Sequence, residues 1–441
     1  MPATSADSTQ GAIARAVAAQ ALSQVLDHAC NLGDALEPLA GRLGSGRDRA
    51  LARRLCNRVL RDLPALQWRL EKLLNKPLAR RDRTVHFLLL MALDQLLEGR
   101  EPAAAVIHAS VAAARSLDRP HLAGLANAVL RNYQRRSKQI EQQLPDDPAL
   151  RLGMPGWLVE RVRRDWPEHW HDILEQSNAS PPLWLRVNRR RSSPSALQAE
   201  LAQAGIECRP EPGLPDALKL AHPARISALP GYELGAFSVQ DGGAQAAVEL
   251  LELADGQRVL DACAAPGGKA AHILERADVA LTALELDPTR AARIADNFKR
   301  LGLTGEVIVG DAQRPGDWAA DRRFDRILID VPCSATGVMR RHPEIRWLRR
   351  PGDIDGNAIL QRAMLEALWP LLAPGGLLVY ASCSILHAEN REPVSHFIAH
   401  HADAEIARNA PERSIATEPG RQILPGSLDR DGFYYACIRR L

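Results

Sequence analysis

Apolar residues recur every three to four positions through most of the first 140 residues, and few of them are β-branched. On an α-helix this spacing places the apolar residues of each segment on one face. Short breaks containing Gly, Pro or Asp separate the segments, as is typical of helix ends. The segments span 12–29, 47–63, 84–98, 104–117 and 121–139. The pattern therefore predicts an all-α bundle over residues 1–140.

The pattern changes twice after the predicted bundle. Residues 141–176 are rich in Pro, Asp, Arg and Trp, and we interpret them as a linker with one or two short helices. Residues 177–237 contain a strand, a helix and two short strands, which predicts a small α+β domain. Arg186 and Asn188 stand at the end of its first strand.

Strand and helix patterns alternate from residue 238 to residue 441. This alternation predicts a parallel, doubly wound sheet in a Rossmann-like α/β domain. The run 324–329 has the composition of a strand that is covered on both faces. Residues 431–441 could add an antiparallel edge strand. The predicted parallel strands span 258–264, 279–287, 306–312, 324–332 and 375–383.

Charge is distributed unevenly along the chain. Residues 1–140 carry 21 Lys and Arg against 12 Asp and Glu, whereas the remainder carries 35 against 41. A basic helical domain favours a polyanionic partner. A solvated basic face would have the same composition, so charge alone leaves both interpretations open.

Cysteine usage and hydropathy restrict the class of protein. The seven cysteines include no C-x-x-C pair, which argues against a disulfide framework and a zinc knuckle. The longest apolar run, 85–93, is too short to span a bilayer, and the N-terminus lacks the pattern of a signal peptide. We therefore expect a soluble cytoplasmic protein that uses no metal.

A glycine-containing turn and three acids follow the predicted strands. The turn DACAAPGGKA, 261–270, lets the backbone approach a ligand, but it lacks the spacing of a dinucleotide loop, and Lys269 lies in no phosphate-binding motif. Glu285, Asp311 and Asp330 end the next three strands, at the edge where parallel sheets bind ligands. Each acid alone could be a helix cap. Together they suit a cationic nucleoside without phosphates, so we expect S-adenosylmethionine as the cofactor.

Cys333 and Cys383 end the fourth and fifth strands, and therefore belong to the same edge of the predicted sheet. A buried thiol is most often inert packing. Two thiols beside a methyl donor also have a chemical use, because a thiolate that adds to carbon 6 of cytosine makes carbon 5 nucleophilic. Asp330 is placed to hold or supply the proton at N3. The residues themselves leave open which thiol adds and which assists turnover.

The ordered motifs DACAAPGGK, GDA, DVPCSATG and YASCS, within residues 258–441, resemble the NOL1/NOP2/Sun family of RNA 5-methylcytosine methyltransferases. The segment GVMRRHPEIRWLRR, 337–350, and a helical domain similar to the NusB RNA-binding fold resemble the bacterial members of the family. Those members methylate a cytosine of small-subunit 16S rRNA. The resemblance extends over nearly the full chain.

The resemblance implies a role for each motif residue. It assigns the nucleophile to Cys383, and it assigns breakdown of the covalent intermediate to Cys333. Ser382 stands where a threonine is usual, and Glu285 where many members have aspartate, which leaves Asp287 as a weaker alternative for the ribose contact. The implied cofactor contacts are Cys263, Ala264, Ala265, Pro266, Gly267, Gly268, Lys269, Glu285, Asp311 and Asp330.

The arginine-rich segment that follows Cys333 has two interpretations. It could bind RNA and stack Trp347 on an exposed base, or it could pack against its own domain, and we favour RNA binding because a flipped base needs support. The candidate arginines are Arg340, Arg341, Arg346, Arg349 and Arg350. We interpret His342 as structural and Cys263 as a non-reacting contact with the cofactor. The cysteines assigned to packing are Cys30, Cys56, Cys208 and Cys437.

The leading hypothesis is thus a monomeric enzyme that acts on 16S rRNA and needs no membrane or protein partner. A 5-methylcytosine methyltransferase acting on tRNA is one alternative. A non-catalytic RNA-binding assembly or antitermination factor is another, although intact Cys333, Cys383 and Asp330 argue against it.

Overall fold

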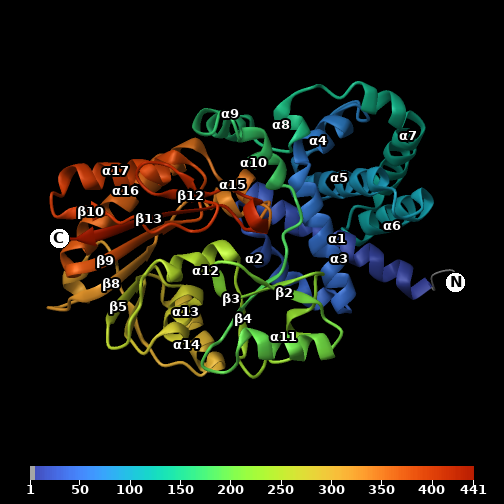
Figure 1. The fold of residues 1–441 in the computed structure, drawn as a ribbon. Coiled ribbons are helices and arrows are strands. Elements are labelled where there is room, and N and C mark those ends of the chain that lie inside the picture. The colour runs from blue at the N-terminus through green and yellow to red at the C-terminus, as the bar shows by residue number, and fades with distance from the viewer. Residues whose placement is uncertain (1–4) are drawn as a thin grey trace. The chain divides into compact units, whose positions relative to one another are not determined.

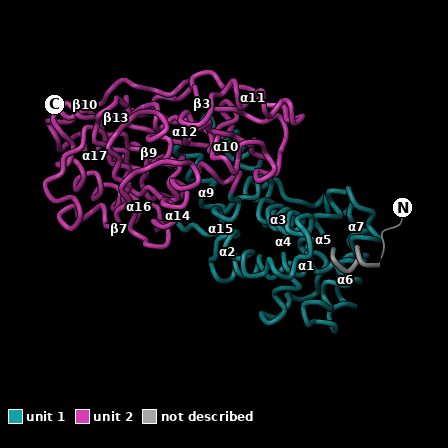
Figure 2. The backbone as a smooth tube through the Cα atoms, turned by 90° about the horizontal axis from the view of Figure 1, so that it is seen from below, with its two compact units in different colours: residues 1–178, 342–350 teal, residues 179–341, 351–441 magenta. Residues whose placement is uncertain are grey.

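The computed structural model describes residues 5–441, with side chains from residue 11 onward, and divides into two compact units (Figure 2). Unit 1 comprises the chain up to residue 178 together with 342–350. Unit 2 comprises 179–341 and 351–441. Each unit has its own buried hydrophobic residues.

The bundle of unit 1 is built around α1 (Ser5–His28), which packs against α2, α3, α5 and α6. Ala14, Val17 and Ala18 are each fully buried, because α1 presents small and branched apolar residues on most of its surface. All five predicted helices are confirmed, and α2 and α4 were not predicted. The helices of the bundle are α1, α2 (Leu32–Leu36), α3 (Gly46–Arg61), α4 (Leu63–Glu71), α5 (Arg83–Glu98), α6 (Ala103–Ser116) and α7 (Ala123–Gln142).

Two further parts of the chain complete unit 1. The segment predicted as a linker forms α8 (Pro148–Arg151), α9 (Gly156–Asp165) and α10 (Trp170–Gln176). Much later in the sequence, α15 (Ile345–Leu348) adds Trp347 and Leu348 to the bundle core. A single turn of helix distant in sequence therefore becomes part of the N-terminal unit.

Unit 2 begins with a small antiparallel sheet in the order β2-β3-β1-β4. Its elements are β1 (Trp184–Val187), α11 (Pro194–Gln203), β2 (Cys208–Glu211), β3 (Leu214–Leu220) and β4 (Phe237–Val239). Ser193 caps α11 by accepting a hydrogen bond from Ala196 N. The predicted α+β domain is thereby confirmed, and its expected end at residue 237 falls inside β4.

The large sheet of unit 2 has the order β11-β12-β13-β9-β8-β5-β6-β7, and β10 also pairs with β13. The five predicted strands are present and pair in parallel. They are β5 (Arg258–Ala262), β6 (Ala280–Glu285), β7 (Glu306–Val309), β8 (Phe324–Asp330) and β9 (Leu372–Ser382). β6 and β7 follow on one side of β5, and the chain then returns so that β8 pairs with the other side of β5. The strand order therefore reverses between β5 and β8, which makes this point the topological switch point of the sheet.

The C-terminal strand is antiparallel, as predicted, but it does not form the edge of the sheet. β13 (Phe433–Arg440) lies between β9 and β12 (Arg421–Ile423), and β11 (Ile415–Ala416) follows β12. β10 (Ala404–Ile406) pairs with the last residues of β13. The short strands 404–406, 415–416 and 421–423 lack a strong apolar pattern, so the sequence did not reveal them.

Helices cover both faces of the large sheet (Figure 1). One face packs against α12 (Gly242–Glu249), α13 (Gly268–Arg276) and α14 (Pro288–Leu301). The other packs against α16 (Pro351–Leu368) and α17 (Arg391–His400). This is the predicted doubly wound arrangement, and it buries the parallel strands on both sides.

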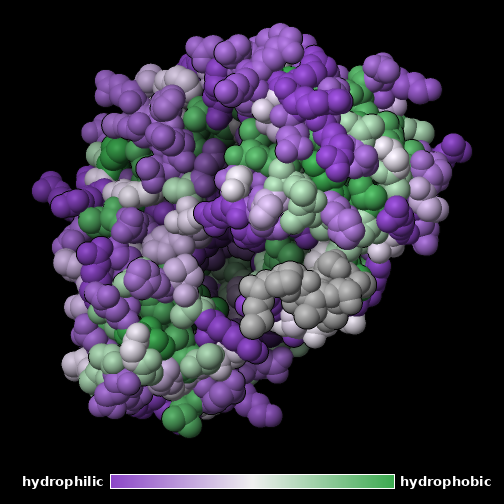
Figure 3. Space-filling view, turned by 90° about the vertical axis from the view of Figure 1, so that its right-hand side faces the viewer, coloured by the Kyte–Doolittle hydropathy of each residue, from purple (hydrophilic) through white to green (hydrophobic). Residues whose placement is uncertain are grey.

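On the face drawn in Figure 3, hydrophilic side chains predominate and hydrophobic ones lie between them in small patches. Among residues 5–441, no helix is both long and apolar enough to cross a membrane.

Candidate active site

The two strand-end cysteines lie together. β8 and β9 are neighbouring parallel strands in which Asp330 pairs with Ala381, so each strand delivers its cysteine to the same edge of the sheet. The Sγ atoms of Cys333 and Cys383 are 3.5 Å apart. The predicted proximity of the two thiols is therefore confirmed.

Backbone contacts fix the two cysteine loops to one another. Gly337 N donates a hydrogen bond to Cys383 O at 2.8 Å, and Val331 N donates to Ala381 O at 3.0 Å. A Cβ atom at Gly337 would lie 2.1 Å from Gly432 O. Glycine is therefore required at position 337, where the loop that follows Cys333 passes close to the backbone of Gly432 and Cys383.

Lys269 belongs to the glycine turn and also forms an ion pair with Asp330. Its Nζ atom is 2.7 Å from Asp330 Oδ2, and it lies 5.5 Å from the centroid of the Phe433 ring. Burial alone would lower the pKa of Lys269, but the charge of Asp330 and the hydrogen bond to it outweigh burial and raise that pKa. The sequence predicted both residues as site residues, but it did not predict this ion pair.

The surroundings of Cys383 favour the protonated thiol over the thiolate. Its hydrogen bond with Cys333, burial and the Asp330 charge raise the pKa of Cys383 well above its ordinary value, and Lys269 opposes them. The raised pKa disfavours a resting thiolate, so we expect activation to accompany binding of the substrate.

The glycine turn joins β5 to α13 at the switch point of the sheet. Ala264 N donates to Leu284 O at 2.9 Å, which ties the turn to the neighbouring strand β6. Gly267 has φ +95°, and its Cα lies against α14, where a Cβ would come 3.1 Å from Ile294 Cα. The turn therefore holds its backbone in a fixed shape at the place where a parallel sheet binds nucleosides.

The acids around the turn fit a cationic ligand. Asp261 is fully buried, and neither of its carboxyl oxygens has a hydrogen-bond partner of good geometry among the described residues. Burial and the Asp330 charge raise the pKa of Asp261 to about 8. Buried carboxyl oxygens without partners suit the sulfonium and ammonium groups of S-adenosylmethionine better than phosphate.

Glu285 supports the glycine turn directly. Its Oε2 accepts a hydrogen bond from Ala265 N at 3.2 Å, and its Oε1 lies 3.3 Å from Arg290 Nη1. Asp287, the alternative ribose contact, instead caps α14 by accepting from Thr289 N at 2.7 Å. The geometry therefore favours Glu285 over Asp287 as the acid that faces the turn.

Asp311 follows β7 and is less enclosed than Glu285. Its side chain accepts a hydrogen bond from Gln313 N at 2.9 Å, and its carbonyl accepts from Trp318 Nε1 at 2.8 Å. These contacts orient the loop and leave the carboxylate partly exposed. Its predicted contact with the cofactor remains a proposal.

The remaining cysteines differ in exposure. Burial raises the pKa of Cys263 and that of Cys437 to about 12, and Cys56 is also fully buried. Cys208 and Cys30 are partly exposed. Burial and raised pKa values predict low reactivity for Cys263, Cys437 and Cys56. Low reactivity agrees with the packing role predicted for Cys437 and Cys56 and with the cofactor contact predicted for Cys263.

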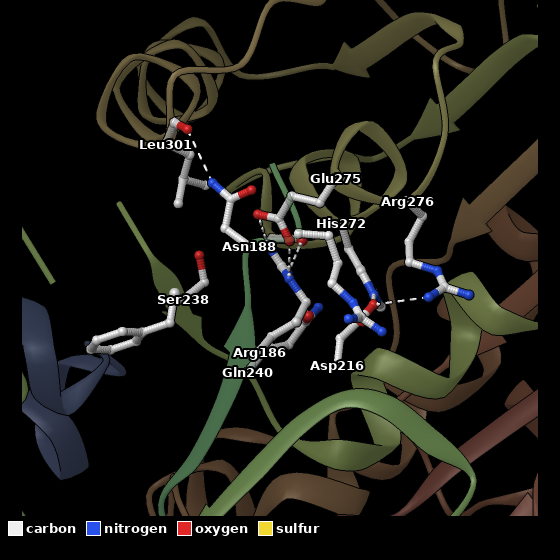
Figure 4. Close-up of polar contacts among 12 residues, drawn as sticks. Arg186, Asn188, Asp216, Ser238, Gln240, His272, Glu275, Arg276 and Leu301 are labelled. Carbon is white, nitrogen blue, oxygen red and sulfur yellow. Dashed lines mark hydrogen bonds and ion pairs between the residues drawn. The ribbon is translucent and has the colours of Figure 1, made fainter. Parts of the chain in front are cut away.

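The small sheet is bound to the helix that follows the glycine turn (Figure 4). Arg186, on β1, is fully buried and forms a bidentate pair with Glu275 at 2.8 and 2.9 Å. Its Nη1 also donates to Gly268 O, the first residue of α13. Asn188 donates from Nδ2 to Leu301 O at 3.1 Å. The strand end singled out in the sequence therefore positions α13.

The sequence favoured RNA binding for the arginine-rich segment 337–350, and this interpretation is wrong for Arg340, Arg346 and Trp347. Arg340 is buried against Asp431. In unit 1, Arg346 is buried and donates to Gly153 O and Asn178 Oδ1. Trp347 Nε1 donates to Leu60 O, so these side chains are structural. Each makes polar contacts distant in sequence, which a local arginine-rich pattern cannot reveal.

His342 is more than half exposed, and its Nδ1 lies 3.6 Å from Glu344. Sequence reasoning missed Glu389, whose buried carboxylate bonds to both Ser334 and Ser384. The serine that follows each cysteine was visible in the sequence, but nothing linked either one to Glu389.

Sequence models of three families match the chain. Residues 12–135 match the NusB family, and residues 154–227 match a ferredoxin-like domain described as Methyltr_RsmF/B-like. Residues 248–439 match the family described as 16S rRNA methyltransferase RsmB/F. The predicted NusB-like, small α+β and methyltransferase parts are thus confirmed in this order.

Curated relatives align over nearly the full chain. A protein of Serratia proteamaculans named ribosomal RNA small subunit methyltransferase B is 45% identical over 428 residues, 97% of this chain and 98% of the relative. A Vibrio cholerae protein of the same name is 47% identical over 427 residues, 97% of each chain.

Solved structures share the fold. PH0851 has a TM-score of 0.82 and 22% identity, with coverage of 98% of this chain and 99% of that one. A methyltransferase homologue from Pyrococcus horikoshii has a TM-score of 0.60 and 27% identity, with coverage of 67% and 98%. NSun6 from the same organism, solved with SFG, has a TM-score of 0.58 and 21% identity, with coverage of 65% and 98%.

Proposed function

The chain belongs to the 16S rRNA methyltransferase RsmB/F family, and from this premise we propose that it methylates carbon 5 of a cytosine in small-subunit rRNA through a covalent adduct. The observation that carries the proposal is the pair of thiols 3.5 Å apart beside the Lys269–Asp330 ion pair. Such a pair matches a reaction that needs one thiol to add and a second group to assist release.

In the proposed reaction, the proton of Cys383 passes through the Asp330 carboxylate to N3 of the bound cytosine, and the Cys383 sulfur adds to carbon 6. Asp330, held by Lys269, keeps a proton at N3 so that the ring accepts the negative charge created by the addition. Lys269 also stabilises the developing thiolate, since its charge opposes the effects that raise the pKa of Cys383. After carbon 5 is methylated, Cys333 assists removal of the carbon 5 proton, and the bond to Cys383 then breaks.

S-adenosylmethionine supplies an electrophilic methyl group when bound. The residues proposed to hold it are Glu285, Asp311, Asp330 and the turn from Cys263 to Lys269. Glu285 is proposed to face the ribose because it is fixed against the turn by Ala265 N.

The basic bundle is proposed to contact the rRNA backbone. Arg131, Arg135, Arg136 and Lys138 are exposed on α7, and Arg80 and Arg81 are exposed before α5. Exposed Lys and Arg contribute to affinity for RNA without reading its sequence. Free cysteines at all seven positions and an rRNA substrate support the cytoplasm as the place of action.

The test uses the full chain with labelled S-adenosylmethionine and a panel of 16S rRNA, 23S rRNA and tRNA. We expect label to enter 16S rRNA with wild type and not with Cys383→Ala. Cys333→Ala should instead accumulate a denaturant-stable adduct and release little product. Label in tRNA alone would overturn the proposed substrate, and transfer without any adduct would overturn the covalent mechanism.

A further inference from the structure

Glu389 lies fully buried between the two cysteine loops, at the end of a short 3₁₀ turn, His387–Glu389. Its Oε1 accepts hydrogen bonds from Ser334 N at 2.6 Å and from Asn357 Nδ2 at 2.8 Å. Its Oε2 accepts from Ser334 Oγ and Ser384 Oγ, each at 2.5 Å. Both oxygens of the carboxylate are therefore engaged by two donors each.

The partners of Glu389 occupy matched positions. Ser334 directly follows Cys333, and Ser384 directly follows Cys383. One carboxylate thus bonds to the residue after each thiol, although it touches neither sulfur. Because one buried carboxyl group holds a residue of each loop through hydrogen bonds of 2.5–2.6 Å, this link restrains both loops together.

A third hydroxyl closes the network around the same point. Thr336 Oγ1 lies 3.2 Å from Ser384 Oγ and accepts from Ile385 N at 3.1 Å. Asn390 Nδ2 donates to Ser384 O at 2.9 Å. Ser334, Thr336 and Ser384 are each buried, so water does not compete for these bonds.

We propose that Glu389 is a positioning residue that sets the distance between the two reacting thiols, an inference that rests on the function proposed above. It acts through Ser334 and Ser384. With the carboxylate in place, Cys383 and Cys333 present their sulfurs to the same bound base. Without it, each loop can shift independently, and the adding and releasing steps lose their shared geometry.

The Glu389→Gln variant tests this role with little change in size. The substitution replaces one acceptor oxygen by an NH₂ group, which cannot accept a hydrogen bond. If the NH₂ replaces Oε1, it faces the N–H donors of Ser334 and Asn357, and if it replaces Oε2, the hydroxyls of Ser334 and Ser384 lose the oxygen to which they donate. Glu392, exposed in the first turn of α17, provides the matched control Glu392→Gln.

The first readout is independent of methylation. Diamide takes one hydrogen from each thiol and is reduced to the hydrazine while a sulfur–sulfur bond forms, and peptide mapping of the full chain gives the rate for the Cys333–Cys383 pair. The sulfurs, now 3.5 Å apart, must approach to about 2.05 Å. We expect Glu389→Gln to slow this step by at least about tenfold, and Glu392→Gln to leave it unchanged.

The second readout separates positioning from folding. Glu389→Gln should lower kcat for rRNA methylation by about 100-fold and leave the Kd for S-adenosylmethionine unchanged, because the glycine turn lies outside the network. Ser334→Ala and Ser384→Ala remove one donor each, and should show the same pattern more weakly. They keep the proposal testable if Glu389→Gln does not fold.

Two results would overturn the inference. One is a wild-type rate of disulfide formation in Glu389→Gln and in both serine variants. The other is a loss of kcat that only follows the loss of folded protein and of cofactor affinity. If wild type methylates no RNA while Glu389→Gln still slows disulfide formation, the proposed function fails and the positioning of the thiols by Glu389 stands.

Discussion

Gly337 N donates a hydrogen bond to Cys383 O at 2.8 Å, so the loop that carries one thiol is bonded to the residue that carries the other. A substitution at Gly337 should therefore affect both cysteines at once. This contact is the basis of the first prediction.

Gly337→Ala should disable the enzyme and destabilise unit 2. Its Cβ would lie 2.1 Å from Gly432 O and 2.8 Å from Cys383 O, and neither backbone atom can move without opening the loops. We expect kcat to fall by about 100-fold and the free energy of unfolding by about 1–3 kcal/mol. Gly352→Ala is the control, because nothing lies within 4 Å of its added Cβ. Equal activity of the two variants would contradict the prediction.

Removal of Cys333 should make Cys383 more reactive in the absence of RNA. The hydrogen bond with Cys333 is the largest cause that raises the pKa of Cys383, so Cys333→Ala lowers that pKa and increases the thiolate fraction at a given pH. Iodoacetamide labelling at pH 8, followed by peptide mapping, should show faster alkylation of Cys383 in the variant. Cys208→Ala should have no effect, and an unchanged rate in Cys333→Ala would refute the assigned cause.

Acidification should destabilise unit 2 through His272. This fully buried side chain lies 3.2 Å from Asp216, and burial lowers its pKa to about 4 from 6.5. The unfolded chain binds a proton between these pH values and the folded chain does not, so stability falls as pH decreases from about 6.5 to about 4. Between pH 7 and pH 5 the loss is about 2 kcal/mol.

Urea unfolding at these two pH values provides the measurement. His272→Gln should remove this part of the pH dependence, whereas the exposed His171→Gln should retain it. An identical pH dependence in wild type and His272→Gln would contradict the assignment.

The same cluster resembles a metal site, since Asp216, Glu249 and His272 lie close together, but Arg276 already pairs with both acids.

Arg346→Ala should weaken the fold of unit 1 and leave rRNA contacts intact. Its guanidinium donates to Gly153 O, Ser177 O and Asn178 Oδ1, and these buried acceptors would lose their donor. We expect a loss of at least about 2 kcal/mol in thermal or urea unfolding. Arg135→Ala, which changes an exposed residue of α7, should instead reduce the salt dependence of rRNA binding by about 0.7–0.9 in log–log slope. The reverse pattern would restore the RNA-binding interpretation of the segment.

The sequence revealed those features that depend on local patterns. Parallel strands have continuous apolar runs, and strand ends deliver Cys333, Cys383 and Asp330 to one edge, so the fold class and the thiol pair could be predicted. Contacts between distant parts of the chain could not. The Glu389 network, the Lys269–Asp330 pair and the burial of Arg346 each depend on side chains that meet only after folding.

The central claim is that Cys383 forms the bond to carbon 6 and that Cys333 serves release. 16S rRNA transcribed with 5-fluorocytidine in place of cytidine traps the adduct, because the carbon 5 fluorine cannot leave as a proton. After nuclease and trypsin digestion, mass spectrometry should find the methylated nucleotide on the peptide that contains Cys383, in wild type and in Cys333→Ala. The nucleotide on the Cys333 peptide would contradict the account.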